Sequence, residues 1–244
     1  MINKIKKIIN NPRKAWRYLN IAISKRLNRK KNILVMIGID SSGELDILHP
    51  GYKLCYGFEA NPIRYKKLIK KYKNRKNIRL YNVAAADYNG EIEFNISNNN
   101  DGASSSIGNF NADWVKTQQS DEIKMIRKIK VPCINLYSFF KENNIHYIDD
   151  YISDIQGMDL QVLKTLIPMI NKKQIGTIRC EVTKDQYKNI YHDLPDNSNS
   201  GFLSILSDNY QLIAKGWGIL KDNKFDKIPD NTWEMDCKWK IKEH

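Results

Sequence analysis

The sequence has few cysteines, and none of them forms a CxxC pair. Its 244 residues contain four scattered cysteines: Cys55, Cys133, Cys180 and Cys237. In an α/β protein of this size such cysteines are expected to be reduced and buried. This pattern favours an intracellular protein over a disulfide-stabilised secreted one.

Long apolar runs are also missing. No stretch reaches the roughly 18 apolar residues that a transmembrane helix requires. The N-terminus is charged, but no apolar segment follows it, so a secretion signal is not expected. The sequence therefore predicts a cytoplasmic protein, with peripheral membrane attachment as an alternative.

Acidic residues are missing from the N-terminal region, because no Asp or Glu precedes Asp40. The first 31 residues contain 11 of the 40 Lys and Arg. The net charge of the whole chain is +13, whereas residues 32–244 carry 29 basic and 27 acidic side chains. We therefore predict a basic arm at 1–31 and one nearly neutral domain at 32–244, a length that suits a single core.

The arm has the pattern of a basic amphipathic helix. Asn11 can cap a helix that has Pro12 at its first position. Apolar residues then recur on one face: Trp16, Leu19, Ile23 and Leu27. Such a helix suits an anionic membrane surface. It can equally pack its apolar face on the main domain, and both interpretations stay open.

Strand and helix signals alternate from residue 32 onward. Strands are predicted at 32–38, 53–59, 77–86, 91–96, 128–134, 149–155 and 174–182, with two closing strands around 211–216 and 235–241. Helices are predicted at 62–73, 135–143 and 158–170, and once more in the last sixty residues. This order predicts an α/β fold with a Rossmann-like, doubly wound sheet. The polar segment 97–121 has no periodicity, and a loop of that length is more often functional than idle.

Two fragments near the first strands suit a nucleotide-type ligand. Gly38 and Gly43 lie in the turn after the first strand, where the backbone must approach the ligand closely. Glu59 ends the second strand about 20 residues later, where a carboxylate can accept both ribose hydroxyls. The spacing is not GxGxxG, which favours S-adenosylmethionine over a dinucleotide. An ordinary strand-to-helix turn and a helix-initiating glutamate are the structural alternatives.

Acidic residues also follow later strands. Asp154 ends the strand expected to be most buried, where a carboxylate is costly unless it is paired or functional. Glu181 closes the next strand, and Asp159 suits the first turn of a helix. Asp87 either reaches an adenine amino group beside Ala84 or caps a turn. The histidines show no ligand spacing, and no metal site is expected.

Several of these fragments resemble the FkbM-type family of S-adenosylmethionine-dependent methyltransferases. The matching segments are YGFEANP, NVAAADYNGEIEF, ISDIQGMDLQVLK and GASSSI, within a resemblance that runs from about residue 32 to the C-terminus. The resemblance implies a class I methyltransferase fold and O-methylation of a hydroxyl, commonly on a sugar of a glycan or natural product. Met36, Ser153 and Gln156 depart from the family pattern, which has an aspartate, a lysine and a glutamate there.

The resemblance also implies roles for individual residues. The cofactor-binding set is Gly38, Asp40, Gly43, Glu59, Ala60, Asn61, Ala84, Asp87 and Asp154. The candidates for the catalytic base are Asp154 and Glu181. The acceptor-side set is Ser104, Ser105, Ser106 and Gln156, with the 97–121 loop as a lid.

Other functions remain as alternatives. An RNA methyltransferase would use the basic arm to bind phosphates, although the domain itself is nearly neutral. A cofactor-binding protein without turnover would use the arm at a membrane surface. A dinucleotide enzyme is disfavoured by the missing glycine fingerprint.

Overall fold

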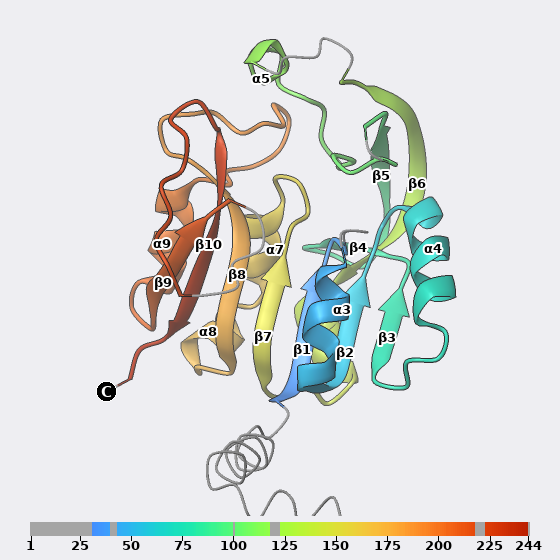
Figure 1. Ribbon diagram of the computed structural model, residues 1–244, viewed down its shortest axis with the longest axis vertical. Coiled ribbons are helices and arrows are strands. Elements are labelled where there is room, and N and C mark those ends of the chain that lie inside the picture. Colours follow the sequence, from blue (N-terminus) through green and yellow to red (C-terminus); the bar gives the residue numbers. More distant parts are fainter. Residues whose placement is uncertain (1–30, 40–42, 100, 118–122, 218–222, 244) are drawn as a thin grey trace, which may run out of the picture. The chain divides into compact units, whose positions relative to one another are not determined.

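The computed structural model describes residues 31–39, 43–99, 101–117, 123–217 and 223–243. The predicted arm, except for Lys31, and the predicted cofactor residue Asp40 lie outside these ranges. The described chain forms a large sheet flanked by helices, with a smaller sheet beside its carboxyl-terminal edge (Figure 1).

The large sheet has seven strands in the order β3-β2-β1-β7-β8-β10-β9. Their bounds are β1 Lys31–Ile37, β2 Tyr52–Phe58, β3 Ile78–Tyr81, β7 Ile148–Ser153, β8 Ile175–Thr183, β9 Tyr210–Gly216 and β10 Glu234–Ile241. The pairs β2–β3, β1–β7 and β7–β8 are parallel, whereas β10 is antiparallel to both neighbours. This order confirms the predicted Rossmann-like sheet. β1 and β7 are adjacent in it, although β2, β3 and the smaller sheet come between them in the sequence.

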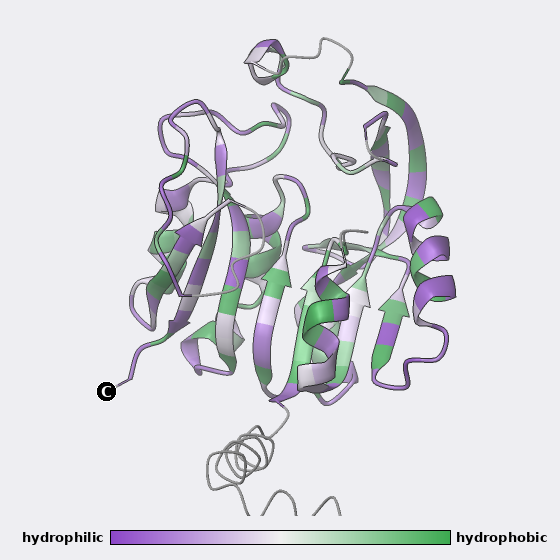
Figure 2. Ribbon diagram, in the orientation of Figure 1, coloured by the Kyte–Doolittle hydropathy of each residue, from purple (hydrophilic) through white to green (hydrophobic). Residues whose placement is uncertain are grey.

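Helices cover both faces of this sheet. Alternate residues of a strand point to opposite faces, so each strand contributes to two cores. Leu34 and Met36 of β1 pack with α3 (Glu44–Leu48) and α4 (Pro62–Tyr72), and the short helix η1 (His49–Gly51) follows α3. Val35 and Ile37 belong to the other core. That core includes α6 (Leu136–Glu142), α7 (Asp159–Thr165), α8 (Ile167–Asn171) and α9 (Asn199–Leu206). In Figure 2 the central strand β1 is mostly green, as expected for a strand buried on both faces.

The prediction of one strand over 77–86 was wrong, because this segment forms two strands in different sheets. β3 pairs with β2, whereas β4 (Ala84–Ala86) pairs with β6 (Met125–Asn135) in a three-stranded sheet of order β4-β6-β5. Between them, the Asn82 side chain donates to the backbone carbonyls of Glu59 and Ala60. These bonds join the break between the strands to the end of β2. β5 (Gly90–Ser97) is an antiparallel edge strand, as predicted.

The single helix predicted over 158–170 was also wrong, because α7 and α8 are separate. Leu166 lies between them with φ −93° and ψ 6°, outside the helical region. Pro168 follows, and its ring would clash with a carbonyl one helical turn earlier while its nitrogen offers no hydrogen. A proline near the start of α8 is tolerated, so the chain begins a new helix there.

The polar 97–121 loop is partly ordered by its neighbours. Its first half folds back on β5 through backbone bonds in both directions between Asn95 and Ser106. It ends in the short helix α5 (Ala112–Thr117), which the sequence pattern did not reveal. Among the residues that the structure describes, no helix has the length and apolar character needed to cross a bilayer.

Candidate functional site

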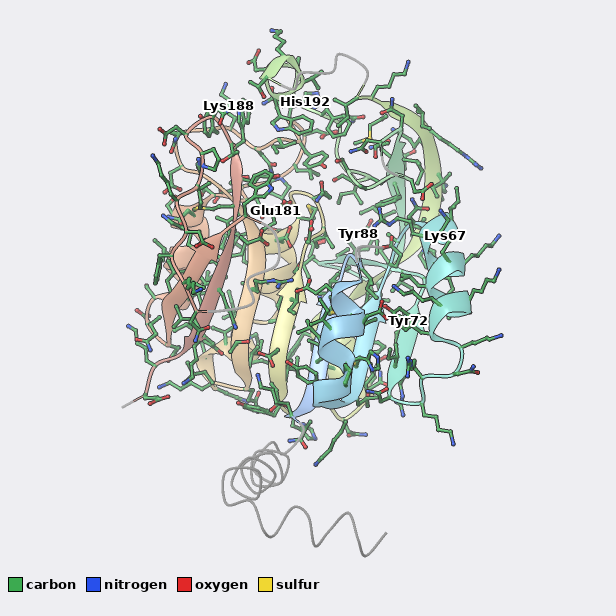
Figure 3. The ribbon with its side chains drawn as sticks, in the orientation of Figure 1. Lys67, Tyr72, Tyr88, Glu181, Lys188 and His192 are labelled. Carbon is green, nitrogen blue, oxygen red and sulfur yellow. The ribbon has the colours of Figure 1, made fainter. Side chains whose placement is uncertain are left out.

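A cavity of about 1080 Å³ lies at the carboxyl ends of the parallel strands. Its wall includes the ends of β1 and β2, strand β4, the turns after β7 and the far part of β8, together with the start of β10 and the 101–107 segment. Figure 3 shows Glu181 at this end of β8. Small-molecule sites usually occupy about 300–1,000 Å³, so this cavity is at the large end of that range.

Glu59 lies in the cavity wall on the side of β2. Its side chain is buried, Oε1 accepts a hydrogen bond from the Asn61 backbone nitrogen at 2.7 Å, and Oε2 lies 3.9 Å from the Arg64 Nε. Asn61 itself caps α4, because its Oδ1 accepts from the Ile63 nitrogen at 3.0 Å. The cap and the ion pair hold the Glu59 carboxylate rigidly at the end of its strand.

The position of Gly38, where β1 and β7 end side by side, requires a residue without a side chain. Its φ is +72°, and a Cβ atom would lie 1.8 Å from the carbonyl oxygen of Asp154. The Asp154 nitrogen in turn donates to the carbonyl of Ile37 at 3.0 Å. Gly43, with φ +89°, instead begins α3 and accepts from the nitrogens of Asp46 and Ile47. Gly38 lines the cavity, whereas Gly43 does not.

The wall between β2 and the small sheet is apolar. Its members share small or flat side chains: Ala60, Val83, Ala84, Ala85, Phe94 and Ile107. Asp87 lies beyond this wall, where its Oδ2 accepts from the Gln161 amide at 3.0 Å. A flat hydrophobic slot next to a buried carboxylate suits a nucleoside, whose base is apolar on its faces and whose ribose carries hydroxyls.

On the opposite side, Gln156 joins two carboxylates. Its Nε2 donates to Asp154 Oδ1 at 2.6 Å and to Glu181 Oε2 at 3.2 Å. Its Oε1 accepts from the Tyr191 hydroxyl at 2.7 Å, and its backbone carbonyl accepts from the Ser106 Oγ at 2.8 Å. Gln156 has φ +58°, an unusual conformation for a residue other than glycine. Its amide groups are thus committed to holding the carboxylates, which gives it a positioning role in this structure.

Glu234, the first residue of β10, completes an acidic cluster. It is buried in the cavity wall, where its charge acts on the neighbouring Glu181. Burial, reinforced by the neighbouring carboxylates, raises the pKa of Glu234 to about 8 and the pKa of Glu181 well above its usual value. Two carboxyl groups that interact this strongly titrate together, so their titration belongs to the pair.

Asp159 lies beneath this cluster and is completely buried. Its Oδ1 accepts from the Ser153 Oγ at 2.5 Å, and its Oδ2 accepts from the Ile155 nitrogen at 3.3 Å. Burial, with Asp154 adding to it, raises the pKa of Asp159 to about 7. These bonds hold the turn that presents Asp154, which supports the structural interpretation of Asp159.

Asp154 itself is exposed rather than buried, contrary to the expectation for the end of a central strand. The strand ends at Ser153, and the tight approach of Gly38 turns the next residue out of the sheet. The Asp154 carboxylate therefore avoids the desolvation cost that the sequence pattern suggested.

Three tryptophans line the cavity near the acidic cluster: Trp114, Trp217 and Trp233. Trp114 stacks on Phe110 at 5.1 Å, and Phe110 stacks on Tyr191 at 5.5 Å. Trp233 stacks on Tyr187 at 4.9 Å. Aromatic faces beside hydrogen-bonding groups suit a ligand that is apolar on one face and polar at its edge.

The structure brings most of the predicted site residues to this cavity. Those in its wall are Gly38, Glu59, Ala60, Ala84, Ser104, Ser105, Asp154, Gln156 and Glu181. Those outside it are Gly43, Asn61, Asp87 and Ser106, of which Asn61 and Ser106 support wall residues. Asp40 lies outside the described residues. The described residues contain no group of three His, Cys, Asp or Glu side chains arranged to hold a metal ion.

Sequence reasoning missed Glu234, Tyr191 and the three tryptophans. Glu234 begins the closing strand that the pattern did predict, and β10 pairs beside β8. The available signal for Glu234 was an acidic residue at the start of a strand that neighbours the strand carrying Glu181. The tryptophans lie in or next to irregular segments, where periodicity offers no signal.

Comparison with known families gives a match over residues 42–208, to the family described as the methyltransferase FkbM domain. No curated protein sequence matches the chain significantly.

Comparison with solved structures gives matches at low identity. The chain is similar to the methyltransferase FkbM from Methylobacillus flagellatus, with a TM-score of 0.47 and 12% identity over 87% of this chain and 44% of that one. It thus spans less than half the length of that protein. A second similar structure is an S-adenosylmethionine-dependent methyltransferase from Clostridium acetobutylicum, with a TM-score of 0.44 and 9% identity over 98% of both chains. At TM-scores below 0.5, neither likeness bears on the function of this chain.

Proposed function

Since the chain belongs to the FkbM family of S-adenosylmethionine-dependent methyltransferases, we propose that it transfers a methyl group to a hydroxyl of a sugar in a glycan or glycoconjugate. The observation that carries the proposal is a single cavity with two unlike sides. One side presents Glu59 beside an apolar slot, and the other presents carboxylates beside tryptophans.

The side formed by β1, β2 and β4 fits the cofactor. Glu59 would accept hydrogen bonds from the ribose hydroxyls, because each carboxylate oxygen has two lone pairs. Ala84 and Ala85 would contact the faces of the adenine, and Gly38 and Asp154 lie where the amino-acid portion would end. S-adenosylmethionine supplies an electrophilic methyl group when bound. The chain's own task is therefore to align the acceptor oxygen and to remove its proton.

Glu181 is the proposed base, with Asp154 as the neighbouring carboxylate. The Glu181–Glu234 pair, when it holds one proton, carries one negative charge and can take a proton from the acceptor hydroxyl. The acceptor oxygen would then receive the methyl group that bound S-adenosylmethionine supplies, and the proton would remain on the carboxyl pair until solvent removes it. A base with a raised pKa is better matched to this task near neutral pH than an ordinary glutamate.

The tryptophans support a sugar as the acceptor. Sugar rings have apolar C–H faces that pack on aromatic rings, and hydroxyl edges that hydrogen-bond to carboxylates. Trp114 and Trp233 are held by ring stacking, so these flat surfaces are pre-formed. Methylation at oxygen is part of the proposal, as are the identities of the sugar and of its hydroxyl.

The test separates the two sides of the cavity with two variants. Glu59→Ala should weaken calorimetric binding of S-adenosylhomocysteine by about tenfold to a hundredfold, because charge-assisted hydrogen bonds are lost. Glu181→Gln should bind S-adenosylhomocysteine like the wild type. It should lose about 10²- to 10⁴-fold in transfer of labelled methyl groups to a glycan panel.

Glu142→Ala, at an exposed position on α6, is the matched control and should change neither measurement. Full transfer by Glu181→Gln would contradict its role as the base. Labelled product only on amine acceptors would contradict O-methylation.

A further inference from the structure

One segment of the domain is strongly basic although the domain as a whole is nearly neutral. Residues 60–86 contain nine Lys and Arg and no Asp or Glu. This segment comprises α4, β3 and β4, together with the turns around them. The compensating acids lie elsewhere in the domain, so its charge is segregated.

The basic side chains gather on the outer face of α4. The inner face packs on the sheet through Leu68 and Tyr72, which are buried. At 100° per residue, the opposite face presents the exposed residues Lys66, Lys70 and Lys73. Figure 2 colours most of this helix as hydrophilic, and Figure 3 shows Lys67 extending away from the sheet.

Few acids neutralise this face. Lys67 pairs with Asp101 at 2.6 Å and Lys71 pairs with Asp46 at 2.6 Å, and all four side chains are exposed. Within the described part of the chain, the other exposed bases of the segment from 66 to 76 form no ion pair with Asp or Glu: Lys66, Lys70, Lys73, Arg75 and Lys76.

Two large apolar side chains lie among these lysines. Ile63 is 53% exposed and Ile69 is 44% exposed. Ile63 points from the middle of the basic face, and Ile69 lies at its edge. Isolated exposed apolar residues are common, but two on one strongly basic helical face form a specific pattern.

We propose that the outer face of α4 docks on the surface of an anionic phospholipid membrane. The flexible lysines attract anionic headgroups. The two isoleucines insert between these headgroups as far as the boundary of the acyl chains. Nucleic-acid surfaces favour arginine forks and aromatic stacking, whereas this face is built from lysine and isoleucine.

The docking face adjoins the cavity. Arg64, on the inner side of the same helix, lines the cavity. Asp101, the ion-pair partner of Lys67, also lines it. Docking through α4 would therefore place the cavity edge formed by residues 101–105 next to the lipid headgroups. The docking proposal does not rest on the proposed chemistry, because vesicle binding is measured without turnover.

The experiment is flotation of the full chain with vesicles of phosphatidylglycerol and phosphatidylcholine, compared with vesicles of phosphatidylcholine alone. The test variant is Lys66→Glu, Lys70→Glu and Lys73→Glu combined. The control reverses three exposed lysines on the other face of the sheet: Lys141→Glu, Lys164→Glu and Lys172→Glu. Both variants change the net charge equally and keep residues 1–31, so only the position of the charges differs.

The wild type should bind the anionic vesicles and not the neutral ones, and about 0.5 M salt should release it. The α4 variant should bind at least about tenfold more weakly than the control variant. Ile63→Ser with Ile69→Ser should weaken binding without changing its salt dependence.

Equal binding by the α4 and control variants would overturn the proposal, as would equal binding to neutral vesicles. Salt-sensitive binding of single-stranded RNA that only the α4 variant loses, without vesicle binding, would assign this face to nucleic acid instead.

Discussion

The two sides of the cavity are built in different ways. The side formed by β1, β2 and β4 uses residues within about fifty positions of one another, and each lies in or directly after the strand that positions it. The acidic side combines Asp154, Glu181, Tyr191 and Glu234, which come from two parallel strands, a loop and an antiparallel strand. A side built from neighbouring strand ends is visible in sequence, whereas a side assembled from distant segments is not.

One ion pair joins the two sides. The Nη1 and Nη2 atoms of Arg179 on β8 donate to Oε1 and Oε2 of Glu44, each at 2.5 Å. Both side chains are buried. Glu44 directly follows Gly43, and Arg179 lies two residues before Glu181. The turn after β1 and the strand that carries the proposed base are therefore held together by this pair.

Breaking that connection should have the largest effect. Arg179→Met leaves the Glu44 carboxylate buried without its partner, which should lower the free energy of unfolding by about 3–5 kcal/mol. Urea denaturation measures the change. Replacing both partners, Arg179→Met with Glu44→Leu, should recover much of the loss, since no charge then remains buried. A single variant as stable as the wild type would show that the pair does not hold the two sides together.

Disturbing the contact between β1 and β7 should come next. Gly38→Ala forces a Cβ atom to within 1.8 Å of the Asp154 carbonyl and strains a backbone with φ +72°. We expect a loss of at least about 2 kcal/mol, seen as a lower midpoint in thermal unfolding. Gly51→Ala is the control, because no atom lies within 4 Å of its added Cβ. An equal effect of the two substitutions would contradict the close approach of the strands.

The acidic side alone should respond to Glu234→Gln. In the wild type, Glu234 keeps its proton up to a pKa of about 8, while an unfolded glutamate loses its proton near 4.5. The folded state therefore binds more protons in this window, and stability should fall as pH rises from about 5 to 8, by up to about 1.4 kcal/mol per pH unit.

The Glu234→Gln variant should lose less stability over the same window. Its activity should also reach its plateau at a lower pH, because one carboxyl that raises the pKa of Glu181 is gone. Denaturation at pH 6 and pH 8, together with the pH profile of methyl transfer, measures both effects. An unchanged pH profile of methyl transfer would show that Glu234 does not affect the pKa of the proposed base.

The smallest effect is expected from Tyr191→Phe. The hydroxyl donates to Gln156 Oε1, and its loss frees the amide that holds Asp154 and Glu181 together. The turnover number should fall about threefold to tenfold with little change in the affinity for S-adenosylhomocysteine, corresponding to one hydrogen bond of about 1 kcal/mol. Tyr187→Phe, which keeps its stacking on Trp233, is the matched control. A change in the affinity for S-adenosylhomocysteine without a change in the turnover number would contradict the role of Tyr191 on the acidic side of the cavity.

The sequence by itself determined most of the elements and indicated the residues that line the cavity side formed by β1, β2 and β4, because both depend on local order. Hydrophobic runs specified the buried strands, Asn61-Pro62 specified the start of α4, and the fragment ending in Glu59 placed a carboxylate at a strand end. Each of these signals depends on only a few neighbouring residues, so it can be recognised in the sequence without knowing how the chain packs. They were insufficient where a strand changes sheets, as at Asn82, whose hydrogen bonds to the end of β2 form only in the folded chain.

Only the tertiary structure decided how the carboxylates behave. Asp154, expected to be buried, is exposed, whereas Asp159 is completely buried. Glu234 meets Glu181 because β10 is inserted antiparallel beside β8, at a separation of more than fifty residues in the chain. The pKa of a carboxyl depends on its burial and on the charges around it, and both are properties of the packed chain. The sequence specified which acids exist, and the fold determined which of them are buried together.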